Sequence, residues 1–124
     1  PDFIAKVHRE LADDGVFILG EETIPRWSNK SGRLAAVREL ASELHEYLKD
    51  HSAPQRMHEI VDATIANDLT ENGEYKLSLP ILRDMLTPLF NIVEHIHLWP
   101  AAPRDFGDIL LILTKKLSPA VDPL

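Results

Sequence analysis

The chain has 124 residues, of which 44% are hydrophobic, and this is enough for one compact domain with its own core. It contains no cysteine, which excludes disulfide bonds, thiol nucleophiles and cysteine-based zinc sites. The 13 Lys and Arg face 20 Asp and Glu, which gives a net charge of −7 without any basic run. Because a nucleic-acid interface must neutralise phosphates, this balance argues against direct nucleic-acid binding and favours a basic protein partner.

The apolar segments do not predict a membrane protein. The longest apolar run, Ile109 to Leu113, is far too short to cross a bilayer. The first residues do not have the pattern of a secretion signal, because Lys6 and Arg9 stand among acidic residues without a long apolar core. We therefore expect a soluble, cytoplasmic protein.

The first half of the chain predicts three helices and one irregular segment. Residues 2–14 and 31–50 have apolar side chains at helical spacing, and the second of these stripes is the clearer. A third helix is expected over residues 54–69, because its first residue, Pro54, suits the first turn of a helix. Residues 15–30 are expected to be irregular, since the short apolar run near their start has no evident strand partner.

The second half of the chain predicts two more helices. Residues 79–99 have the wide apolar stripe of a central helix, with a kink or a break expected at Pro88. Residues 103–117 contain the run ILLIL, which also fits a buried strand, but the acidic start and basic end favour a helix. The predicted fold is all-α, a single domain over residues 1–124. Four of its five helices form a bundle, and the first helix and residues 15–30 cover one side.

Two acidic pairs in neighbouring predicted helices form a candidate metal site. Glu43 and Glu46 are three residues apart in one helix, as are Glu59 and Asp62 in the next. Residues at this spacing lie on one side of a helix, and Mg²⁺ prefers carboxylate oxygens and substrate phosphates as ligands. This ExxE…ExxD arrangement resembles the metal signature of the all-α nucleoside triphosphate pyrophosphohydrolases, the MazG-like group. The resemblance implies that the four carboxylates hold Mg²⁺, which positions the nucleotide for attack by water.

The same four carboxylates also fit a solvated acidic surface. On a helical wheel, Glu46 and Glu59 lie nearly opposite the apolar stripes of their helices, whereas a site between packed helices needs carboxylates beside the contact. We therefore interpret the protein as a non-catalytic, acidic interaction or regulatory domain without a cofactor. The Mg²⁺-dependent pyrophosphohydrolase is the alternative.

A proline-rich turn near the end of the chain contains the candidate partner-binding residues. Trp99, Arg104 and Phe106 lie in the segment LWPAAPRDF, and Trp and Arg often anchor protein partners. The alternative role of Trp99 is to cover the end of the core. The predicted partner is a protein, and a homodimer is left open.

Histidines supply two further hypotheses. His45, His51 and His58 lie near the acidic pairs, and their protonation at mildly acid pH would reduce the negative charge and make association sensitive to pH. His95 and His97 are two residues apart, so they cannot share a metal ion from one helix but could from an extended segment.

Overall fold

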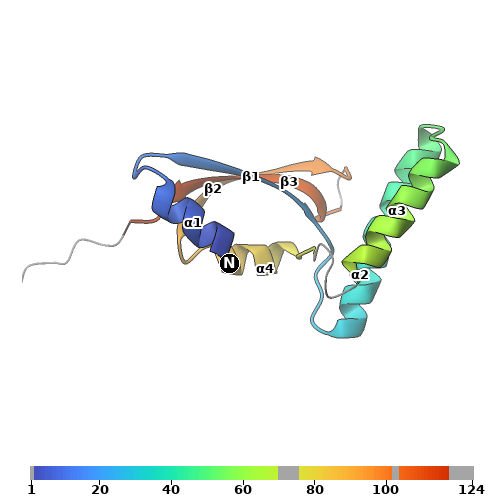
Figure 1. The fold of residues 1–124 in the computed structure, drawn as a ribbon, viewed down its shortest axis with the longest axis horizontal. Coiled ribbons are helices and arrows are strands. Elements are labelled where there is room, and N and C mark those ends of the chain that lie inside the picture. The colour runs from blue at the N-terminus through green and yellow to red at the C-terminus, as the bar shows by residue number, and fades with distance from the viewer. Residues whose placement is uncertain (1, 70–75, 102–103, 118–124) are drawn as a thin grey trace, which may run out of the picture.

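The computed structural model describes residues 2–69, 76–101 and 104–117, and these residues form both helices and strands. In chain order the elements are α1 (Asp2–Glu10), β1 (Val16–Thr23), α2 (Lys30–Asp50), α3 (Gln55–Asp68), α4 (Leu79–Leu86), β2 (Phe90–Trp99) and β3 (Gly107–Lys115). The predicted all-α fold and its four-helix bundle are therefore wrong. Three segments that were expected to be irregular or helical form an antiparallel sheet instead (Figure 1).

The sheet has the strand order β1–β3–β2, with β3 in the centre and antiparallel to both neighbours. β2 and β3 are consecutive strands along the chain. Three helices separate β1 from them, so the pairing of β1 with β3 joins residues that are far apart in sequence. Ile18 in β1 lies opposite Ile112 in β3, and Leu110 in β3 lies opposite Ile96 in β2. These long-range pairings determine the fold.

The helix expected over residues 79–99 is divided into α4 and β2. α4 ends at Leu86, and Thr87 immediately precedes Pro88. Proline cannot donate a backbone hydrogen bond and disfavours helical geometry in the residue before it. The kink or break expected at Pro88 is thus a break, where the helix ends, and the chain beyond it is extended from Phe90 onward.

The other two strands come from segments that had no evident partner in the sequence. The segment expected to be irregular, residues 15–30, contains β1, and the helix expected over residues 103–117 contains β3. The two strands pair with each other over eight registered positions. Residue 103 and the residues beyond 117 lie outside the described part of the chain.

The helices expected in the first half of the chain are confirmed by α1, α2 and α3, although α1 ends earlier than predicted. The start of α2 is capped by Asn29, whose side-chain oxygen accepts the backbone N–H of Gly32 at 2.8 Å. A side chain in this position satisfies one of the N–H groups that a helix start leaves without a partner. None of the described helices combines the length and the apolar character needed to cross a membrane.

Two hydrophobic clusters hold the elements together. In the first, α1 and α4 cover one face of the sheet, and its buried members are Ile4, Leu82, Leu86, Phe90, Ile109, Leu111 and Leu113. The second joins α2 and α3 to the end of the sheet, and its buried members are Ile24, Ala36, Val37, Leu40, Ile65 and Phe106. As a result, the α2–α3 hairpin extends from one end of the sheet instead of lying across it (Figure 1).

A buried ion pair fixes the base of the α2–α3 hairpin. Arg33 Nη2 donates to Asp68 Oδ2 at 2.9 Å and to the backbone oxygen of Lys76 at 3.0 Å. The backbone N–H of Lys76 donates to the other oxygen of Asp68 at 2.7 Å. Because both charged groups are buried and bonded to each other, this network holds the start of α2, the end of α3 and the segment before α4 in one arrangement.

Candidate functional site

The acidic pairs of α2 and α3 do not converge on one point. Glu43 accepts a hydrogen bond from Arg104 Nε at 2.6 Å, and Asp62 Oδ1 lies 2.8 Å from His45 Nε2. Glu46 and Glu59 are exposed. Among the described residues, no three His, Asp or Glu side chains are grouped closely enough to hold a metal ion. The geometry gives no support to the predicted Mg²⁺ site or to the pyrophosphohydrolase activity, and both stay predictions.

The histidines of the hairpin bond to one another and to the backbone. His45 Nδ1 lies 2.7 Å from His58 Nδ1, and the two ring planes differ by only 2°. A hydrogen bond between these two nitrogens requires that one ring donates the proton and the other accepts it. His51 Nδ1 lies 2.8 Å from the backbone oxygen of Tyr47. Sensitivity of association to pH stays a prediction.

The three residues of the proline-rich turn have different surroundings. Phe106 is only 3% exposed and belongs to the second hydrophobic cluster, so it is not available to a partner in this fold. Trp99 packs partly against the same cluster and makes an edge-to-face contact with Tyr47. Arg104 is partly exposed but is held by Glu43. The turn therefore joins the sheet to α2, and the hypothesis that it binds a partner stays a prediction for Trp99 and Arg104.

His95 and His97 lie in the extended strand β2, but they contact different groups. His95 Nδ1 lies 3.3 Å from Arg83 Nη2, and His97 Nε2 contacts the backbone oxygen of Pro100. Partial burial lowers the pKa of His95, and the positive charge of Arg83 and the neighbouring His97 lower it further. His95 is therefore neutral at pH 7, so it can accept a hydrogen bond from Arg83.

The feature that the sequence analysis missed is an uncovered apolar face of the sheet. Alternate residues of a strand point to opposite faces, and the register identifies the residues opposite to those that pack on α1 and α4. In the described part of the chain, no helix lies over this second face (Figure 1). We call it the open face and define it by Val16, Ile18, Ile96, Leu110 and Ile112.

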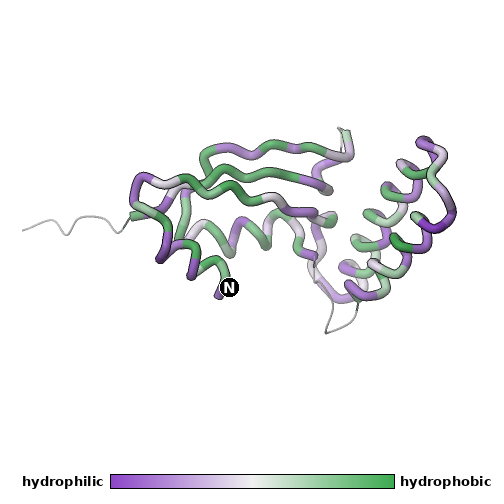
Figure 2. The backbone as a smooth tube through the Cα atoms, turned by 45° about the horizontal axis from the view of Figure 1, so that its top comes forward, coloured by the Kyte–Doolittle hydropathy of each residue, from purple (hydrophilic) through white to green (hydrophobic). Residues whose placement is uncertain are grey.

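The residues of the open face are aliphatic although water has access to them. The side chains of Val16 and Ile18 are 55% and 61% exposed, and Leu110 and Ile112 in the central strand are half-buried by their strand neighbours. Figure 2 shows that the hydrophobic colouring runs along the strands. Contiguous exposed apolar side chains of this kind often mark an interaction site.

The central strand β3 has the composition of a strand that is covered on both sides. Ile109, Leu111 and Leu113 point into the first cluster, and Leu110 and Ile112 between them point to the open face. A strand with one solvated face alternates apolar with polar residues, whereas a strand covered on both faces is a continuous apolar run. In this sheet only one of the two faces is covered by described residues.

Acidic side chains border the open face. Glu94 lies opposite Ile112, and Glu22 and Asp108 lie opposite each other at one end of the sheet. Burial raises the pKa of Glu22, the Lys76 ammonium 3.3 Å away opposes this effect, and a hydrogen bond with Asp108 adds to it. The border of the open face thus carries three carboxyl groups beside one ammonium group.

Comparison with models of protein families, with curated proteins and with solved structures finds no match for this chain.

Proposed function

We propose that this protein is a non-catalytic interaction domain that binds a protein partner through the open face. The observation that carries the proposal is the uninterrupted apolar run of β3, which places large aliphatic side chains on the uncovered face as well as on the covered one. A partner that covered Ile18, Leu110 and Ile112 would bury them as α1 and α4 bury the opposite face.

The border of the open face defines the chemistry of the partner. Glu22 and Asp108 at one end of the sheet and Glu94 in β2 lie beside an aliphatic centre, and the whole chain has a net charge of −7. A complementary surface has apolar side chains in the middle and Lys or Arg around them. A second copy of this chain would bring acidic borders together, so a basic protein is the better occupant. The cytoplasmic location predicted above stays a prediction.

A pair of designed peptides tests this proposal. Both form an amphipathic helix with the same leucine stripe, but one has lysines beside the stripe and the other has glutamates. We expect the lysine peptide to bind and to shift the NMR signals of Ile18, Leu110 and Ile112, and the glutamate peptide to bind at least about tenfold more weakly. Higher salt should weaken the binding of the lysine peptide.

Matched variants give the control for this experiment. Ile18→Ser should weaken the binding of the lysine peptide by about tenfold, which is the effect of about 1.4 kcal/mol. Met57→Ser removes a similarly exposed apolar side chain from α3 and should leave the affinity unchanged. Equal binding of the two peptides, or signal shifts confined to the α2–α3 hairpin, would contradict the proposal. A stable dimer that Ile18→Ser dissociates would identify a second copy as the occupant instead.

A further inference from the structure

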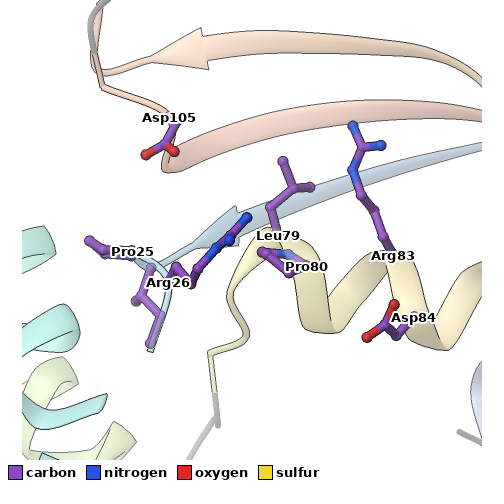
Figure 3. A pocket seen from close by; sticks show the side chains of 8 residues that line it. Pro25, Arg26, Leu79, Pro80, Arg83, Asp84 and Asp105 are labelled. Atoms are coloured by element: carbon purple, nitrogen blue, oxygen red, sulfur yellow. The ribbon is translucent and has the colours of Figure 1, made fainter. Parts of the chain in front are cut away.

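A second site lies away from the open face, where the end of β1 meets the first turn of α4. It is a cavity of about 450 Å³, and Figure 3 shows the side chains around it. Its walls are apolar residues and four charged ones: Ile24, Pro25, Leu79, Pro80, Arg26, Arg83, Asp84 and Asp105. None of these residues belongs to the open face.

Two guanidinium groups in this cavity have no carboxylate partner among the described residues. Within the described residues Arg26 makes no hydrogen bond or ion pair, and the side-chain contact of Arg83 is with the neutral ring of His95. A neutral imidazole can orient a guanidinium but does not compensate its charge. The remaining donors of both arginines are therefore available to an anion.

The start of α4 adds further donors beside the arginines. Ser78 occupies the N-cap position, but its side chain makes no capping hydrogen bond. Ser78 is only 1% exposed, and its hydroxyl oxygen has no hydrogen-bond partner within the part of the chain that the structure describes. Ser78 is adjacent to Leu79 and bridges to Ile24, so it adjoins two residues of the cavity wall. A helix start presents positive partial charge and free N–H groups, to which anions bind favourably, although Pro80 in the first turn of α4 has no N–H to donate.

The two carboxylates give the cavity a second kind of contact. Arg83 extends from α4 towards the strands, whereas Asp84 points in a different direction, and Asp105 reaches the cavity from the segment before β3 (Figure 3). These carboxylates repel a bare anion but accept hydrogen bonds from hydroxyl groups. Donors and acceptors therefore line one cavity whose remaining wall is apolar.

The geometry points to a binding site for a small phosphate ester that also carries hydroxyl groups, the class of sugar phosphates and nucleoside monophosphates. Arg26, Arg83 and the start of α4 hold the phosphate, and Asp84 and Asp105 accept hydrogen bonds from the hydroxyls. The apolar wall contacts the body of the ligand. This site is independent of the proposed partner binding.

Thermal unfolding at constant ionic strength tests this site. The ligands are inorganic phosphate, glucose 6-phosphate and adenosine monophosphate, with glucose and adenosine as unphosphorylated controls. A ligand that binds the folded state alone raises the melting temperature. We expect both esters to raise it more than inorganic phosphate does, and the controls not to raise it; the larger shift of the two identifies the ester class. No shift with either ester would overturn the inference, and equal shifts with inorganic phosphate would overturn the role of the hydroxyls.

Charge-neutral variants locate the effect. Arg26→Gln and Arg83→Gln should each weaken binding of the esters by roughly tenfold, because each removes a charge-assisted contact. Arg56→Gln, at an exposed arginine of α3, is the matched control and should keep the wild-type affinity. Changes in the NMR signals of Leu79 and Ile81 when an ester is added to the wild-type protein locate the binding site without any substitution. If all three variants bound the esters with equal affinity, or if the NMR signals of Leu79 and Ile81 did not change when an ester was added, the proposed location would be overturned.

Discussion

The two faces of the sheet have similar side chains but different surroundings. In β3, Leu111 points to the face that α1 and α4 cover, and its neighbour Leu110 points to the open face. In β1, Phe17 packs against the first cluster, while Ile18 beside it is 61% exposed. The comparison shows that hydrophobicity alone does not separate inside from outside here. The positions of the helices decide which face is the core and which is available to a partner.

The largest expected difference is between two leucines that are adjacent in β3. Leu111→Ala should destabilise the protein by about 2–5 kcal/mol, because it leaves a cavity in a fully buried position. Leu110→Ala should cost about 1 kcal/mol or less, since water already reaches that side chain. Urea unfolding of both variants measures the difference. If the two costs were equal, the open face would already be covered in the free protein.

A smaller difference is expected between two threonines on opposite sides of the sheet. Buried Thr23 donates from Oγ1 to the backbone oxygen of Gly107 and accepts from its N–H, both at 3.2 Å. Thr23→Val should therefore cost about 1–3 kcal/mol, because it removes both hydrogen bonds at a buried position. Thr114→Val, beside the open face, should change stability by less than about 0.5 kcal/mol. Chemical unfolding compares them, and equal effects would contradict the difference between the faces.

The smallest expected effect is a pH dependence that comes from Glu22 at the border of the open face. The pKa of Glu22 is raised above 4.5 in the folded state. At pH values between 4.5 and this raised pKa, the folded protein therefore binds more protons than the unfolded chain does. The stabilisation linked to protonated Glu22 is present below about pH 4.5 and is lost as pH rises through the folded pKa.

The variant Glu22→Gln isolates this pH dependence. Relative to Glu22→Gln, the wild-type protein should become less stable as pH rises through this window. Unfolding free energies measured at several pH values between 4.5 and 7 give the slope, and Glu59→Gln in α3 serves as the exposed control. A difference between wild type and Glu22→Gln that does not change with pH would show that the border carboxyl is solvated like an ordinary one.

The sequence predicted the α2–α3 hairpin because its signals are local. The apolar stripe that contains Val37 and Leu40 recurs at helical spacing, and both residues are fully buried in the second cluster. The strands were missed because their signals depend on partners that are distant in the chain. The run ILLIL of β3 fits a strand as well as a helix, and only its pairing with β1 and β2 distinguishes the two.

The candidate sites were missed for a similar reason. Residues 15–30 were expected to be irregular, whereas the alternation of β1 divides Val16, Phe17 and Leu19 between the two faces of the sheet. Conversely, Glu43 and Asp62 each belong to an acidic pair with the spacing of metal ligands, but Glu43 accepts a hydrogen bond from Arg104 and Asp62 contacts His45. One signal was available in the sequence: a continuous aliphatic run in a strand predicts that both of its faces are covered.

The sequence by itself determined the acidic charge, the absence of thiol chemistry and the first three helices. Composition and local spacing are sufficient for these features, because helix hydrogen bonds and caps join residues only a few positions apart. The tertiary structure alone decided the sheet, its open face and the cavity beside Arg26 and Arg83. Strand pairs and convergent side chains join residues that are far apart in the chain, and no local pattern specifies which of them meet.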